Sequence, residues 1–161
     1  MALGGNLAGE GGVSSLVVME AALARFADAG LKVARRSSFW RSKSWPDPTR
    51  PDYINAVAIV ETSLNPGETL AALHRLEAEF GRRRSESNAP RILDLDLIAY
   101  GREVADGEGF HLPHARAHER LFVMGPLAEI APSWRHPVSG ATAAELARRA
   151  TVGADAKAIG S

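Results

Sequence analysis

The sequence predicts one domain that mixes helices with strands. Its 161 residues are enough for one domain with a hydrophobic core and too few for two of ordinary size. Some stretches place apolar residues at helical spacing, and others show the alternation or the β-branched content of strands. Two of the predicted helices begin near residues 16 and 66, and the longer predicted strands are 31–40, 52–62 and 91–101.

The composition narrows the class of protein. Hydrophobic residues make up 45% of the chain and charged residues 24%, and no apolar run is long enough for a membrane span or a signal peptide. We therefore expect a cytoplasmic protein. The absence of cysteine excludes disulfides, thiolate metal sites and a cysteine nucleophile. The 19 basic and 19 acidic residues balance, which gives no reason to expect non-specific binding to nucleic acid or membranes.

The first elements are a short strand, a helix and a second strand. Residues 1–7 read MALGGNL, which predicts a few strand residues ended by a turn at Gly4-Gly5-Asn6. The helix that follows ends at Gly30, a residue type typical of a position just beyond a helix. Its apolar stripe is Leu16, Met19, Leu23 and Phe26. After the 31–40 strand, the three prolines of segment 41–51 predict a loop. Trp45 in this loop is either a packing anchor or an aromatic lid over a flat ligand.

The 52–62 strand carries an unusual polar residue. Tyr53, Asn55 and Val57 alternate onto one face, so a ring and an amide lie together. A buried amide costs free energy unless its donors and acceptors are matched. The donors and acceptors of the Asn55 amide would be matched either by a neighbouring loop or by a planar heterocycle with amide-like edges.

A second predicted helix leads into a basic segment. It starts at Pro66, stops at Gly81 and places His74 and Glu77 one turn apart. Its apolar stripe is Leu70, Leu73, Leu76 and Phe80. Three arginines, 82–84, and then Arg91 follow. They either complement the dipole of the helix as solvated charges or reach a phosphate held at the next strand.

The 91–101 strand, RILDLDLIAYG, carries two acidic residues on one face. Asp94 and Asp96 alternate with Leu93, Leu95 and Leu97, so their Cα atoms are expected roughly 6.6 Å apart. Neighbouring carboxylates repel each other unless a cation lies between them, and hard oxygen ligands suit Mg²⁺. The alternative is an edge strand with two solvated aspartates.

The last third of the chain is rich in histidine. His111, His114 and His118 lack the spacing of zinc ligands, so zinc is disfavoured. Residues 121–130 are expected to form a short helix. Thr142 and Glu145 form a capping box for a last helix that ends near residue 149. We expect a single domain over residues 1–151 and a flexible tail over 152–161.

Several motifs together resemble a known family. GGNL, PDYINA, GRRR, PRILDLDLI and LPH followed by ERLFVMGPLAEIAP occur in this order, over about residues 3–145. The chain therefore resembles 6-hydroxymethyl-7,8-dihydropterin pyrophosphokinases of folate biosynthesis. The resemblance implies a ferredoxin-like α+β fold, in which helices pack on one face of an antiparallel sheet. It also implies transfer of pyrophosphate from MgATP to the hydroxymethyl oxygen of the pterin.

The resemblance assigns roles to individual residues. Asp94 and Asp96 would hold two Mg²⁺ ions, while Arg82 and Arg91 would engage the phosphates as catalytic arginines. The pterin would be bound by Tyr53, Asn55, Phe122 and a closing Trp45. The ATP side would comprise Glu77, Arg84, His114 and Arg120.

The chain also departs from the family pattern. Ser87-Asn88-Ala89 is shorter than the tryptophan-containing loop of many members, and Ala115 replaces an aromatic residue. The usual first strand starts several residues earlier. The alternative function is a ferredoxin-like nucleic-acid-binding module, against which the acidic pair and the zero net charge argue. We expect the partners to be ATP and the pterin, with no nucleic acid, no membrane and a monomeric state.

Overall fold

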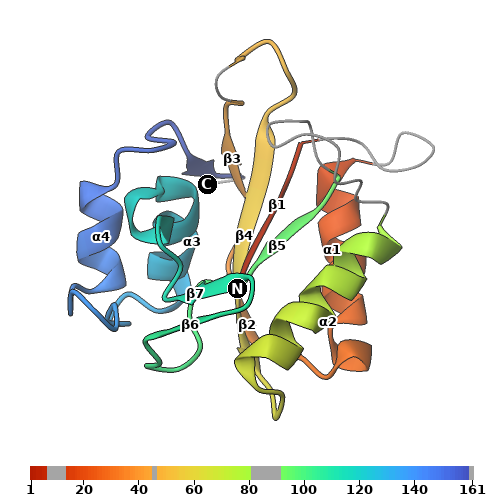
Figure 1. Cartoon of the computed structure of the whole chain (residues 1–161). Coiled ribbons are helices and arrows are strands. Elements are labelled where there is room, and N and C mark those ends of the chain that lie inside the picture. Colours follow the sequence, from red (N-terminus) through yellow and green to blue (C-terminus); the bar gives the residue numbers. More distant parts are fainter. Residues whose placement is uncertain (7–13, 45–46, 81–91, 160–161) are drawn as a thin grey trace.

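The computed structural model describes residues 1–6, 14–44, 47–80 and 92–159. Within these ranges, a six-stranded sheet lies between a layer with α1 and α2 and a layer with α3 and α4 (Figure 1). The sheet strands are β1 (Ala2–Gly5), β2 (Lys32–Arg36), β3 (Trp40–Ser42), β4 (Tyr53–Glu61), β5 (Asp94–Asp96) and β8 (Lys157–Ala158). The helices are α1 (Ser15–Arg25), α2 (Pro66–Glu79), α3 (Leu121–Ile130) and α4 (Ala143–Arg149). A separate hairpin pairs β6 (Ala105–Gly107) with β7 (Phe110–Leu112).

The sheet is antiparallel and is built around β4. This nine-residue strand pairs with β1 on one side and with both β2 and β3 on the other. The strand order is β5-β1-β4-β3-β8, so β5 lies at an edge. The chain order β1-α1-β2-β4-α2-β5 agrees with the βαββαβ order of a split βαβ motif. The α+β class that the resemblance implied is therefore confirmed.

The predicted strand 31–40 is divided into β2 and β3 at Ser37. Ser37 N donates to Val57 O, and Ser37 Oγ accepts from Val57 N, both at 2.9 Å. The side chain thus supplies a hydrogen bond that the backbone would supply in an unbroken strand. This break bends the strand while leaving both of its parts paired with β4.

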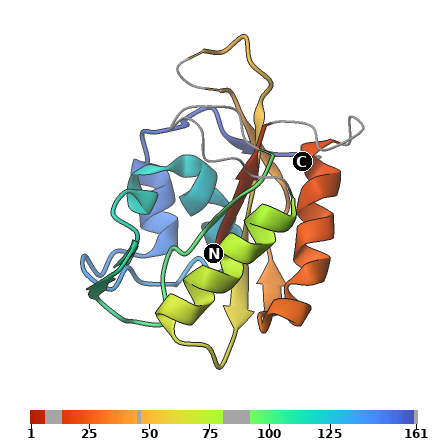
Figure 2. The ribbon, with the colours of Figure 1, turned by 45° about the vertical axis from the view of Figure 1, so that its right-hand side comes forward.

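One face of the sheet is covered by α1 and α2, which lie side by side in Figure 2. The core on this face contains Leu3 and Leu95 from the strands, Met19 from α1 and Leu73 from α2, all at most 3% exposed. Asn65 caps α2 with a capping box to Glu68. Both helices were predicted from their apolar stripes, and both are confirmed.

The opposite face is covered by α3 and α4, which corrects the expectation that helices pack on one face only. Val57 of β4 packs there with Met124 of α3 and Leu146 of α4. The central strand β4 carries apolar residues on both faces, so each face needs a helical layer. The helix predicted over 121–130 is confirmed, as is the Thr142 cap of α4, whose Oγ1 accepts from Glu145 N at 3.2 Å.

Glu129 and Gly125 of α3 contact Ser38, which lies between β2 and β3, and Trp40 of β3. Glu129 accepts hydrogen bonds from Ser38 N at 2.5 Å, from Ser38 Oγ and from Trp40 Nε1 at 3.2 Å. A Cβ atom on Gly125 would lie 2.6 Å from the Trp40 ring, so the indole lies directly on the helix backbone. The absence of a side chain at Gly125 thus lets α3 approach Trp40 closely, and Glu129 adds hydrogen bonds from the same helix.

The segment after α4 differs from the predicted flexible tail. Val152 forms a bridge with Arg120, and β8 pairs with β3 as an outer strand. Backbone pairing does not need a long apolar sequence, which is why this short, small-residue stretch gave no strand signal.

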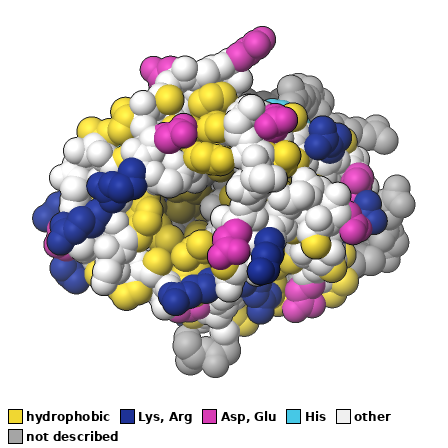
Figure 3. Space-filling view, turned by 90° about the horizontal axis from the view of Figure 1, so that it is seen from below, with side chains coloured by type: hydrophobic (Ala, Val, Ile, Leu, Met, Phe, Trp, Pro, Cys, Tyr) yellow, Lys and Arg dark blue, Asp and Glu magenta, His cyan; other side chains and the backbone are white. Residues whose placement is uncertain are grey.

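Hydrophobic side chains also reach the surface at one end of the molecule. Figure 3 views the molecule from below and shows a hollow surrounded by such side chains. In Figure 1, this lower end carries the turn between β4 and α2, whereas the turn between β3 and β4 lies at the top.

None of the helices in the described ranges is long and apolar enough to cross a membrane.

Candidate active site

The two predicted metal ligands lie on the edge strand β5. Leu95 between them is 3% exposed and faces α1 and α2, whereas Asp94 is half-buried and Asp96 is exposed. Side chains alternate along a strand, so both carboxylates project from the opposite face, which α3 partly covers. The predicted alternation of residues 93–97 is thus confirmed, although the regular strand is only Asp94–Asp96.

Gly4 lies between Asp94 and Asn55 in a row across three strands. It pairs with Asp94 of β5 on one side and with Asn55 of β4 on the other. Directly paired residues of antiparallel strands point to the same face. A Cβ atom on Gly4 would lie 3.0 Å from Asn55 Oδ1, closer than side chains normally approach. The glycine leaves the space between the carboxylate and the amide open.

The sequence interpretation missed this role of Gly4. The turn predicted at Gly4-Gly5-Asn6 is wrong for the two glycines, because both belong to β1. A glycine inside a strand often marks a place where another group must approach the backbone closely. That signal was present in the sequence, but the pairing with Asp94 and Asn55 was not.

Asn55 is the buried polar residue of the site. It is only 6% exposed, and its Nδ2 donates to Ser42 Oγ of β3 at 3.3 Å. This bond uses one of the two amide protons. Tyr53 pairs with Ser42 in the same part of the sheet and is half-buried. The amide therefore bonds to a neighbouring strand while its oxygen faces Gly4.

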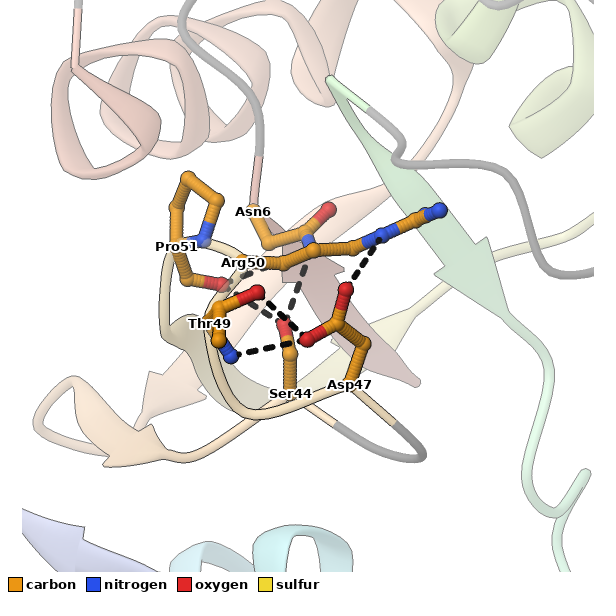
Figure 4. A network of polar contacts seen from close by, with 6 residues as sticks. All are labelled: Asn6, Ser44, Asp47, Thr49, Arg50 and Pro51. Atoms are coloured by element: carbon orange, nitrogen blue, oxygen red, sulfur yellow. Dashed lines mark hydrogen bonds and ion pairs between the residues drawn. The ribbon is translucent and has the colours of Figure 1, made fainter.

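Asn6 connects the end of β1 to the segment between β3 and β4 (Figure 4). Its Nδ2 donates to Ser44 Oγ at 3.1 Å and to Pro51 O at 3.5 Å, and Ser44 Oγ donates to Pro51 O at 2.7 Å. Asn6 and Ser44 are 3% and 5% exposed, respectively. This buried network holds the two ends of segment 44–51 together, and Trp45 lies just beyond Ser44 in the sequence.

Glu77 reaches the carboxylate strand from α2. It is 2% exposed, and its Oε2 accepts a hydrogen bond from Leu95 N at 3.1 Å. Leu95 lies between Asp94 and Asp96, so this bond holds the backbone from which both carboxylates project. It also satisfies an N–H group on an edge strand, which would otherwise lack a ladder partner on that side.

Removing this acceptor is expected to loosen β5. We expect Glu77→Ala to lower the free energy of unfolding by about 1 to 3 kcal/mol, because Leu95 N would be left unpaired in the interior. Glu77→Gln keeps an acceptor oxygen and should cost less. Chemical denaturation measures both values, with Glu79→Ala as the control on the same helix, since Glu79 forms only an exposed pair with Arg25. Equal losses for Glu77→Ala and Glu79→Ala would contradict this role.

His114, Arg120 and Phe122 approach from the other side of the site. His114 N donates to Ile98 O at 2.8 Å, two residues beyond Asp96. Burial lowers the pKa of His114, and the charge of Asp96 opposes that shift. The Arg120 guanidinium lies 5.9 Å from the centroid of the Phe122 ring at the start of α3. These elements bring a histidine, an arginine and an aromatic ring to the face that carries the carboxylates.

Some predicted site residues lie outside the described residues. They are Trp45, Arg82, Arg84 and Arg91. In the described chain, α2 ends at Glu79, three residues before Arg82 in the sequence, and β5 begins at Asp94, three residues after Arg91. The roles of these four residues therefore stay predictions.

The donor set of the site suits a particular kind of metal. Among the described residues there is no group of three or more His, Cys, Asp or Glu side chains that could hold a metal ion. Such groups are typical of zinc sites. Two carboxylates on one strand face instead suit Mg²⁺, which takes few protein ligands and fills its other positions with water and phosphate oxygens. The residues present therefore fit Mg²⁺.

Comparison with known proteins agrees with the motifs. The family model described as 7,8-dihydro-6-hydroxymethylpterin-pyrophosphokinase (HPPK) matches residues 1–132. The 2-amino-4-hydroxy-6-hydroxymethyldihydropteridine pyrophosphokinase of Synechocystis sp. is 46% identical over 118 residues, which are 73% of this chain and 60% of that protein. The enzyme of the same name from Haemophilus influenzae is 46% identical over 95 residues, 59% of each chain. The folic acid synthesis protein fol1 of Pneumocystis carinii is 38% identical over 119 residues, 74% of this chain and 16% of that protein.

The chain spans less than two thirds of the length of each of these three relatives. The family match nevertheless includes Asp94, Asp96, Gly4, Asn55 and the start of α3. These are the residues that the sheet register and the α3 layer bring to one face. The match covers more than half of the chain, and the chain therefore belongs to the 7,8-dihydro-6-hydroxymethylpterin-pyrophosphokinase family.

Proposed function

We propose that this protein transfers pyrophosphate from MgATP to the hydroxymethyl oxygen of 6-hydroxymethyl-7,8-dihydropterin, a step of folate biosynthesis. The observation that carries the proposal is the row of Asp94, Gly4 and Asn55 across the sheet. It places a carboxylate that suits a metal–phosphate group beside an amide that suits a heterocycle, with no side chain between them. The names of the relatives support the same reaction.

Asp94 and Asp96 would hold the two Mg²⁺ ions that accompany ATP. Bound Mg²⁺ would neutralise charge on the phosphates and orient them for in-line displacement. The two aspartates would orient these phosphates on the face that also carries Asn55. The hydroxymethyl oxygen then bonds to the β-phosphorus, the bond from that phosphorus to the α–β bridging oxygen breaks, and AMP leaves. The hydroxyl proton passes to solvent, so no Ser, His or Cys nucleophile is required.

Asn55, Tyr53 and Phe122 would bind the pterin. The Asn55 amide is buried and fixed by Ser42, so it can present its oxygen to a ring edge without losing much side-chain entropy. Tyr53 and Phe122 would stack on the flat ring from β4 and α3. Trp45 would close over it, and the network of Asn6 and Ser44 would set the position from which that segment starts.

The remaining polar residues would serve the ATP side. His114 and Arg120 reach the carboxylate face from the segments that precede α3. Arg84 would bind ATP from the segment between α2 and β5, and Glu77 would act through the backbone of β5. Because ATP is the phosphate donor, we also propose a cytoplasmic location.

Arg82 and Arg91 would act on the transferring phosphates. Their guanidinium groups would complement the charge that develops in the transition state. We expect Arg82→Ala and Arg91→Ala to lower kcat by on the order of 10²-fold with little change in the KM for ATP. Steady-state kinetics measure this, with Arg75→Ala as a control because Arg75 is exposed on α2. A change in KM alone would assign both arginines to ground-state binding instead.

Calorimetric titration tests the proposal directly. Wild-type protein should bind a non-hydrolysable ATP analogue with Mg²⁺, and the complex should then bind 6-hydroxymethyl-7,8-dihydropterin. Turnover with ATP should release AMP in equal amount to the pterin product. A protein that binds the analogue but ignores the pterin would retain only a Mg-phosphate site, and the proposed substrate would be wrong. The acidic pair on the sheet face also disfavours the alternative of a nucleic-acid-binding module.

A further inference from the structure

The segment after α4 crosses from the start of α3 to the outer edge of the sheet. We call residues 151–159 the C-terminal strap. At its beginning, Thr151 N and Val152 N donate to Glu119 O, and Leu121 N donates to Val152 O at 2.9 Å. At its end, β8 pairs with β3 and Ile159 N donates to Phe39 O at 2.8 Å. The strap is therefore attached on both sides of the proposed pterin site.

Gly153 of the strap lies directly against the ring of Phe122. A Cβ atom at this position would lie 2.5 Å from Phe122 Cδ1 and 3.1 Å from Cε1. Real side chains do not approach a ring carbon so closely, so a larger residue would displace either the ring or the strap. The φ angle of Gly153 is +67°, which also favours glycine. The Phe122 ring thus rests on backbone that only glycine provides.

Asp155 attaches the strap to the segment that follows β3. Its Oδ2 accepts a hydrogen bond from Lys43 N at 2.7 Å. Lys43 adjoins Ser42, the partner of Asn55, and Ser44, the partner of Asn6. Between these two attachments, Ala156 N donates to Gly153 O at 2.9 Å and closes a turn. One short turn therefore links the Phe122 ring to the strand that carries the Asn55 partner.

From this geometry we infer that the C-terminal strap sets the position of the Phe122 ring, with Gly153 as the positioning residue, and that it thereby tunes the affinity for the flat substrate ring. The strap lies outside the residues that the family model matches, which end at residue 132. This inference rests on the proposed role of Phe122 in binding the pterin. The position of the ring can be measured without substrate, so the two ideas can be tested separately.

Two glycine substitutions form a matched pair. Gly140 has a φ angle of +71°, close to that of Gly153, but no described atom lies within 4 Å of the place that a Cβ atom would take there. Gly153→Ala and Gly140→Ala therefore impose similar backbone strain, and only the first affects Phe122. We expect both to lower the unfolding temperature. Only Gly153→Ala should weaken pterin binding, by about threefold to tenfold, with unchanged affinity for the Mg²⁺-bound ATP analogue.

The readouts are calorimetric titration with the pterin and NMR of the Phe122 ring. The ring signals are assigned with Phe122→Leu, and they should shift more in Gly153→Ala than in Gly140→Ala. Equal pterin affinities and equal ring shifts in the two variants would overturn the inference. If the wild-type protein did not bind the pterin, the proposed function would be wrong, and so would the inference that the strap tunes the affinity for the substrate ring. The ring shifts would still decide whether Gly153 positions Phe122.

A second pair of variants, at Asp155, tests the same inference if Gly153→Ala does not fold. Asp155 is exposed, so its substitution should leave the fold intact. Asp155→Ala removes the acceptor for Lys43 N, whereas Asp155→Asn retains a side-chain oxygen. We expect the alanine variant to shift the Phe122 signals and weaken pterin binding about threefold, and the asparagine variant to restore both. Identical behaviour of the alanine variant and the wild type would count against the strap.

Discussion

Asp94→Ala and Asp96→Ala are each expected to abolish measurable turnover while the protein stays folded. Each substitution removes a proposed Mg²⁺ ligand that orients the phosphates. Metal stabilisation of transition-state charge contributes several kcal/mol, so we expect a loss on the order of 10³-fold or more in kcat. Release of AMP at saturating Mg²⁺ measures the effect. Asp94 is half-buried and Asp96 is exposed on an edge strand, so little packing is lost.

The control for this pair is Asp28→Ala. Asp28 lies on the surface near the end of α1, where it forms an exposed pair with Arg25. The substitution Asp28→Ala changes the net charge of the protein by the same amount as Asp94→Ala or Asp96→Ala. An effect of net charge alone would therefore appear in all three variants. Thermal unfolding should show midpoints close to that of the wild type in each case. Near-normal turnover by Asp94→Ala or Asp96→Ala at high Mg²⁺ would exclude the metal assignment.

The second large effect is expected at the proposed pterin site. Asn55→Ala should weaken pterin binding by roughly 1 to 3 kcal/mol, because a site built for matched hydrogen bonds loses that amount when one partner is left unpaired. Phe122→Ala should weaken it as well by removing the stacked ring. The affinity for the Mg²⁺-bound ATP analogue should change little in either variant. Calorimetric titration with each ligand separates the two effects.

Asn65→Ala provides a control for the loss of an amide. Asn65 caps α2, and its Oδ1 accepts from Glu68 N at 2.8 Å. Its removal should lower stability by about 1 kcal/mol without touching the carboxylate face. Stability losses shared by Asn55→Ala and Asn65→Ala can then be set apart from effects on the ligand. Tight pterin binding by both Asn55→Ala and Phe122→Ala would rule out the proposed orientation of the substrate.

Local patterns were enough to predict most elements of the fold. The apolar stripe from Leu16 to Phe26 predicted α1, and the alternation around Leu95 placed Asp94 and Asp96 on one face. Such patterns predict helices and strands because the residues that form one buried face of an element lie only a few positions apart in the sequence. Patterns of this kind carry no information about which strands become neighbours. The layer formed by α3 and α4 on the second face was therefore missed.

The sequence by itself determined the chemistry that this protein carries: two carboxylates on one strand face, an amide beside a ring, and the motifs of its family. Only the tertiary structure decided how these parts meet. Gly4 separates Asp94 from Asn55 because β1 lies between β5 and β4, and Gly153 touches Phe122 because the strap returns to α3. Residues 4, 55 and 94 are far apart in the chain. Their alignment depends on hydrogen-bond register between strands, which is set by packing of the whole sheet and not by any local pattern.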